Sequence, residues 1–213
     1  MNFDDLFSIP FNYLGEDLSK INSYIKRNYG KSNRVIHELT SKYVHIDVYP
    51  IPESDEKPFF TLVSVGMGSQ DMLFAQDDKA AAELVLYLSR SPSGEELLKR
   101  YASFLVHMTK FPFANLTFFA EGHTFEFSEE DKKLFPYDGF VFRQSRTKKG
   151  KNTAKVYLPD IDRTVLFYDL IPVFQDEFEL IHNDLQGFFS WVDKEYGLQA
   201  RFADVSRKKH FSL

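Results

Sequence analysis

The sequence contains no cysteine among its 213 residues. This absence excludes disulfide bonds, thiol catalysis and every metal or iron–sulfur site that needs a thiolate ligand. No apolar run approaches the roughly 20 residues that a membrane-spanning helix requires. Residues 1–7 are acidic and lack the basic start of a signal peptide. We therefore expect a cytoplasmic protein, away from membranes, whose core is held by packing alone.

An excess of positive charge is also missing. Lys and Arg number 26 against 31 Asp and Glu, which gives a net charge of −5. A mildly acidic chain has no general attraction for nucleic acids. A basic stretch at 146–155 would allow phosphate contacts, but it has no interleaved aromatic residues for base stacking. We predict a mobile basic loop at 144–153 and no nucleic-acid partner.

Aromatic residues are abundant: 23 Phe and 11 Tyr stand in the chain. They favour half-buried pleated surfaces, and apolar or alternating runs predict strands at 43–51, 59–65, 83–88, 116–120, 123–127, 140–143 and 164–173. Helical spacing predicts helices at 15–29, from a Ser93–Glu96 capping box to Lys110, and from 175 or 184 to 196. The segment 203–205 suggests a last short strand. We predict one α+β domain over 1–213, with an irregular lead-in at 1–13 and a mixed or antiparallel sheet flanked by helices.

Complete catalytic or cofactor motifs are absent. The Gly66-Met67-Gly68 segment follows a predicted strand, as a dinucleotide loop would, but Asp71 stands where the third glycine belongs. No G-x-S-x-G nucleophile elbow is present either. We therefore expect no cofactor and no enzymatic activity.

One polar set leaves an alternative open. His45 and Asp47 are two residues apart in a predicted strand, so their side chains share a face. If Glu83 and His123 lie on neighbouring strands, the four residues could form the site of a metal-dependent or acid–base hydrolase. The other interpretation is a buried polar pair that satisfies its own hydrogen bonds.

Several segments, in order, resemble the suppressor of fused family. They read HIDVY at 45–49, FTLVSVGMG at 60–68, AELVLYL at 82–88, TFFAEGHT at 117–124, LIPVFQDEF at 170–178 and ADVSR at 203–207. The resemblance spans about residues 35–210. Two details depart from the family pattern: Gly68 replaces the serine of Gly-Met-Ser, and Ser89 rather than proline follows Leu88.

The resemblance implies an α+β domain that binds another protein. Short bacterial members include immunity proteins that neutralise toxins, and this chain has their length. Exposed loops around the sheet would supply the contacts, with methionine, aromatic and acidic side chains. The candidates are Met67, Ser69, Asp71, Met72, Phe74, Asp176 and Glu177. Core packing is the alternative for Met72 and Phe74, and a favourable charge at a helix N-terminus is the alternative for Asp176 and Glu177.

Overall fold

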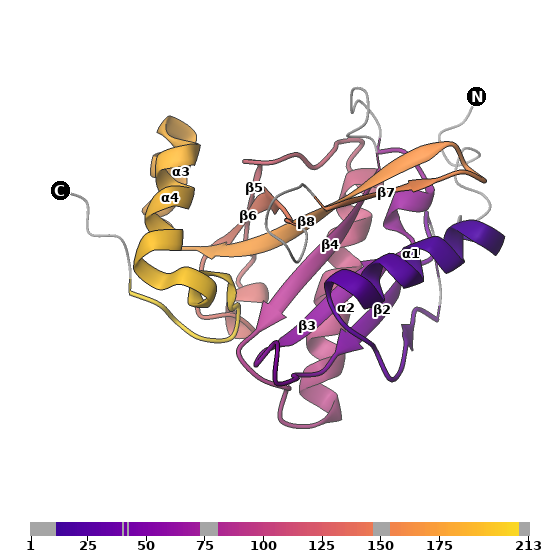
Figure 1. Cartoon of the computed structure of the whole chain (residues 1–213). Helices are drawn as coiled ribbons and strands as arrows, with labels where there is room; N and C mark the ends of the chain where they lie inside the picture. The colour runs from indigo at the N-terminus through magenta and orange to yellow at the C-terminus, as the bar shows by residue number, and fades with distance from the viewer. Residues whose placement is uncertain (1–11, 40, 42, 73–80, 147–153, 209–213) are drawn as a thin grey trace.

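The computed structural model describes residues 12–39, 41, 43–72, 81–146 and 154–208 (Figure 1). Its centre is an eight-stranded sheet in the order β1-β2-β3-β4-β8-β6-β5, with β7 also paired to β8. The strands are β1 Ile36–His37, β2 Asp47–Ile51, β3 Phe60–Val65, β4 Ala81–Leu88, β5 Thr124–Glu126, β6 Gly139–Gln144, β7 Lys155–Leu158 and β8 Arg163–Val173. Strands β4 and β8 run parallel, and the other pairs are antiparallel. The predicted mixed sheet is therefore confirmed.

Helices cover both faces of this sheet. They are α1 Gly15–Asn28, α2 Glu95–Ala114, α3 Glu177–Asn183 and α4 Leu185–Tyr196. In Figure 1, α1 crosses in front of β2 and β3, α2 lies behind the sheet, and α3 and α4 sit at its far end. Alternation along β8 explains the layers: Leu166 and Leu170 face the α2 core, whereas Phe167 faces α1 and Ile171 faces α3 and α4.

A buried carboxylate, that of Asp169, lies on β8 between Phe167, which faces α1, and Ile171, which faces α3 and α4. Asp169 accepts hydrogen bonds from Tyr87 Oη at 3.0 Å, from Arg201 Nη1 at 3.0 Å and from Ser145 Oγ. Burial raises the pKa of Asp169, although the Arg201 guanidinium and the two hydroxyl donors act in the opposite direction. These hydrogen bonds connect β8 to β4 through Tyr87, to the segment after α4 through Arg201, and to the residue directly after β6 through Ser145.

The second predicted helix extends beyond its expected end. We expected Pro112 to stop it after Lys110, but α2 continues to Ala114. A proline lacks only one backbone donor, and here it stands in the last turn, where Phe113 is 1% exposed and anchors the helix in the core. The start also differs: Gly94 is the N-cap and makes no side-chain cap bond, so the predicted capping box at Ser93 is wrong.

Other differences concern short elements. The segment 116–120 is not a strand, and β5 covers only the middle of the predicted strand 123–127. Strands β1 and β7 were not predicted, and the last helix is two helices divided at Asp184. The Asp184 carboxylate accepts from Gly187 N at 2.8 Å and begins α4 as its N-cap. The segment 203–205 makes no strand, although Ala203 N donates to Tyr87 O.

Two predicted segments fall mainly outside the described residues. These are the lead-in at 1–13, of which 12 and 13 are described, and the basic loop at 144–153, of which 144–146 are described. Tyr13 is not part of a loose lead-in, because its side chain is 1% exposed. None of the helices in the described ranges has the length and apolar character needed to cross a membrane.

Candidate functional site

The turn after β3 was our first candidate for partner contact, and the structure makes it an interior element. Met67 is 0% exposed, Met72 is 2% exposed and Ser69 is 5% exposed. Gly66 has φ +126°, and a Cβ there would lie 2.1 Å from the His45 carbonyl oxygen, so no other residue fits. The expectation that Met67 and Ser69 form a binding surface is therefore wrong, and for Met72 the alternative of core packing is confirmed.

Glu83 explains why this turn is held inside. Its carboxylate is 0% exposed and accepts four hydrogen bonds, from Tyr13 Oη at 2.8 Å, Ser64 Oγ at 2.5 Å, Gly66 N at 2.8 Å and Gly68 N at 3.1 Å. Burial raises the pKa of Glu83, and the four donors oppose that shift. Burial, together with the nearby Glu83 carboxylate, also raises the pKa of Tyr13 well above its ordinary value. Glu83 is thus an internal clamp for the turn.

The remaining acidic candidates divide into one internal and two exposed residues. Glu177 is 0% exposed and pairs with Arg207 through both carboxylate oxygens, with Nη1 2.6 Å from Oε1. Asp71 is exposed and pairs with Arg163 Nε at 2.9 Å. Asp176 is exposed at the start of α3, where its side chain forms no cap bond. Phe74 lies outside the described residues. Glu177 is therefore excluded as a contact residue, whereas Asp71 and Asp176 are accessible.

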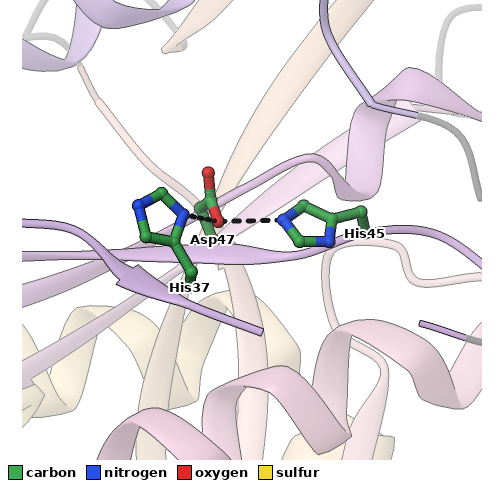
Figure 2. A group of neighbouring side chains, drawn as sticks. All are labelled: His37, His45 and Asp47. Atoms are coloured by element: carbon green, nitrogen blue, oxygen red, sulfur yellow. Dashed lines mark hydrogen bonds and ion pairs between the residues drawn. The ribbon is translucent and has the colours of Figure 1, made fainter. Parts of the chain in front are cut away.

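The predicted His45–Asp47 pair does form, and it gains a third member. His45 Nε2 lies 3.1 Å from Asp47 Oδ1, and His37 Nδ1 lies 2.8 Å from the same oxygen (Figure 2). His37 is on β1 directly opposite Asp47 on β2. Sequence reasoning missed His37 because a two-residue strand has no periodicity; the Val-Ile-His run at 35–37 is the only signal.

Glu83 and His123 do not join this group. Glu83 lies on β4 and gives its oxygens to the turn, as described above. His123 directly precedes β5, at the opposite edge of the sheet from β1 and β2. Its ring packs against Phe118, with 5.1 Å between ring centroids. The four-residue hydrolase site considered from the sequence is therefore not assembled.

Strand β5 forms one edge of the described sheet. Phe127 N donates to Asp138 O, and Phe142 N donates to His123 O, so alternate residues of this strand bond to β6. Thr124 and Glu126 fall between those bonded positions, and both are exposed. Their backbone N–H and C=O groups consequently point away from the sheet, where an incoming strand would meet them.

An open groove runs beside this edge, between β5 and the last turns of α2. Its volume is about 820 Å³, and it is lined by His107, Phe111, Phe118, His123, Phe125 and Asp131, among others. Phe118 and Phe125 are half-buried, and Phe111 meets Phe125 edge-on with 5.3 Å between ring centroids. Outward backbone groups and aromatic surface therefore occur side by side, which is how proteins bind extended peptides.

The family follows from comparison with known proteins. A family model described as "Suppressor of fused protein (SUFU)" matches residues 42–207, well over half of the chain. The chain belongs to the suppressor of fused family. No curated protein matches this suppressor of fused chain in sequence.

Solved structures agree with this assignment at the level of the fold. The crystal structure of the Sufu–Fu complex matches with a TM-score of 0.62 and 14% identity, over 94% of this chain and 92% of the other. A putative suppressor of fused homologue from Neisseria gonorrhoeae matches with a TM-score of 0.53 and 14% identity, over 91% and 93%. At this identity the likeness concerns the fold alone. Both matches fit the α+β class predicted from the sequence.

Proposed function

We propose that this chain is a non-enzymatic protein-binding module that takes up an extended segment of its partner along β5. The observation that carries the proposal is the pairing of an open strand edge with an aromatic groove. Backbone groups of Thr124 and Glu126 would bond the partner's main chain, while alternate side chains of the partner enter the groove. This mode needs no rearrangement of the core.

The chemistry of the groove indicates which segment would fit. Phe111, Phe118 and Phe125 offer apolar and aromatic surface to a large hydrophobic side chain. Glu126 and Asp131 also line the groove, and they would attract a basic residue beside that hydrophobic one. The net charge of −5 would add steering of a basic partner. The expected ligand is therefore an extended basic segment with a bulky apolar anchor.

More specifically, we propose that the partner is a bacterial toxin and that this chain is its cytoplasmic immunity protein. Membership of the suppressor of fused family supports a protein partner, and Sufu, which shares this fold, has been crystallised in a complex with Fu. The toxin proposal adds to this the resemblance of short family members to immunity proteins. Occupation of a toxin's exposed strand or basic segment would block that toxin sterically.

Binding to purified toxin domains encoded beside the gene tests both levels of the proposal. The three variants to compare are Thr124→Pro, Phe118→Ala and Tyr157→Ala. Proline at 124 removes one outward N–H without touching a bond to β6, and alanine at 118 removes part of the groove wall. Tyr157 is 53% exposed on β7 and serves as the matched control.

We expect the two groove variants to weaken binding at least about tenfold, a loss of about 1.4 kcal/mol or more, and Tyr157→Ala to leave it unchanged. Co-expression with the toxin should then restore growth for the wild-type chain and not for Thr124→Pro. Equal binding by all three variants would reject the edge as the site. If the chain binds a protein that is not a toxin through this edge, the proposed protein-binding module is supported and the proposed toxin partner is rejected.

A further inference from the structure

The cluster of His37, His45 and Asp47 lies outside the proposed binding edge and has a role of its own. Two imidazole nitrogens converge on one carboxylate oxygen, Asp47 Oδ1, at 2.8 and 3.1 Å (Figure 2). The three ligand atoms lie within 4.8 Å of one another. The Asp47 side chain is 13% exposed, and His37 is 66% exposed, so the group opens to solvent on one side.

Hydrogen bonds behind His45 fix which of its nitrogens carries the proton. Ser41 Oγ lies 2.9 Å from Glu38 Oε2, and the Glu38 carboxylate also pairs with Lys110 and accepts from Ile46 N. Ser41 has one hydroxyl hydrogen, and a carboxylate can only accept, so that hydrogen points to Glu38. His45 Nδ1, 3.0 Å from Ser41 Oγ, must therefore donate to it.

This arrangement leaves a mismatch on the other side of the ring. A neutral imidazole with its hydrogen on Nδ1 has a lone pair on Nε2, and here Nε2 faces the Asp47 oxygen at 3.1 Å. Two lone pairs facing each other repel unless a proton or a metal cation lies between them. An outer hydrogen bond that sets the tautomer and leaves the second nitrogen free is the usual support of a metal-bound histidine.

We propose that His37 Nδ1, His45 Nε2 and an oxygen of Asp47 bind a divalent transition-metal ion of the Zn²⁺ type. Two imidazoles and a carboxylate match the preferences of such ions. Tetrahedral ligands about 2.0–2.1 Å from the metal lie about 3.3 Å apart, close to the contacts already formed with Asp47. To admit the ion, the two nitrogen–oxygen distances would lengthen by about 0.2–0.5 Å, and the two nitrogens, which lie within 4.8 Å of each other, would come to about 3.3 Å apart.

The metal would join the edge strand β1 and the strand β2 to the connection between them, residues 38–46, through His45. It would keep at least one coordination position open toward solvent beside His37, for water or for a side chain of another protein. Ser41 acts as a positioning residue in this site, because it holds His45 and makes no contact with the metal.

Metal binding by the full chain, prepared without a histidine tag and stripped with chelator, tests the proposal. Titration with Zn²⁺ is followed by calorimetry, and titration with Co²⁺ by the visible absorption that four-coordinate cobalt gives. We expect one ion per chain, affinity more than about 100-fold weaker in His37→Gln, and about 10–100-fold weaker in Ser41→Ala. Exposed His37 can be replaced without loss of the fold, which circular dichroism checks.

His182→Gln is the matched control, since this histidine is exposed on α3 and belongs neither to the cluster nor to the groove beside β5. It should bind Zn²⁺ with wild-type affinity. Failure of the wild-type chain to bind a stoichiometric ion would overturn the proposal. Retention of wild-type affinity in His37→Gln would overturn it as well.

Discussion

The backbone groups of the turn at 66–72 and of the edge strand β5 differ in whether they have a hydrogen-bond partner inside the protein. In the turn, the N–H groups of Gly66 and Gly68 both donate to a buried carboxylate. In β5, the corresponding groups of Thr124 and Glu126 point away from the sheet. Both segments contain large apolar side chains, so hydrophobicity does not separate them. The difference lies in the backbone N–H groups: those of Gly66 and Gly68 donate to Glu83, whereas those of Thr124 and Glu126 point outward at the edge of the described sheet.

The largest expected effect comes from breaking the turn. Glu83→Ala leaves four buried donors without an acceptor, and we expect it to lower the free energy of unfolding by about 3–5 kcal/mol. Urea denaturation of the variant and the wild type measures the loss. Glu83→Gln should lose less, because its amide oxygen still accepts from Gly66 N and Gly68 N. A loss below about 1 kcal/mol in Glu83→Ala would show that the carboxylate does not hold the turn.

A single donor of the same network gives a smaller effect. Tyr13→Phe removes one hydroxyl that donates to Glu83 at 2.8 Å and keeps the ring in the core. We expect a loss of about 1–2 kcal/mol in chemical denaturation. The double variant with Glu83→Ala should lose less than the sum of the two single losses, because both remove the same contact. Strict additivity would mean that the two residues act separately.

The pH dependence of stability reports the cost of burying this carboxylate. Because burial raises the pKa of Glu83 above 4.5, the folded chain binds a proton that the unfolded chain has released. Stability must then fall as the pH rises from about 4.5 through the raised pKa. We expect the wild type to lose stability relative to Glu83→Gln as the pH rises from 4.5 toward neutrality. A constant difference across that range would contradict the raised pKa.

The smallest effect on stability is expected at the open edge. Thr124→Pro removes a backbone donor that has no partner in β6, so its free energy of unfolding should change by less than about 1 kcal/mol. Thermal denaturation checks this against the wild type. Phe125→Pro is the opposite case, because residue 125 is in register with Phe140 and its N–H faces β6. Equal losses in the two proline variants would show that β5 has no free side.

The sequence predicted the long elements well because they have clear periodicity. The helix at α1 and the strands β3, β4 and β8 lie close to their expected positions. Short or interrupted elements were wrong for physical reasons: two residues cannot show alternation, and Pro112 in a last turn costs one bond that the buried Phe113 offsets. Fold class depends on the long elements, which is why it could be predicted.

Predictions of the site were less successful, since they depend on which side chains turn inward. His45 and Asp47 were paired correctly from their spacing, because i and i+2 share a face in an extended chain. Met67 was expected on the surface, and Met72 either there or in the core, because loops are usually exposed. Nothing in the local sequence signals the hydrogen bonds from this turn to Glu83, which lies on another strand. The edge position of β5 depends on strand order, which results from contacts between distant segments and cannot be predicted from the sequence of one segment.

Amide hydrogen exchange with and without the bound partner shows whether β5 is the edge to which the partner binds. We expect the Thr124 and Glu126 amides to exchange fast in the free chain and to become protected when the partner binds. The Gly66 and Gly68 amides should exchange slowly in both states, since Glu83 already holds them. Protection that develops elsewhere while Thr124 and Glu126 continue to exchange fast would contradict the claim that β5 is the binding edge.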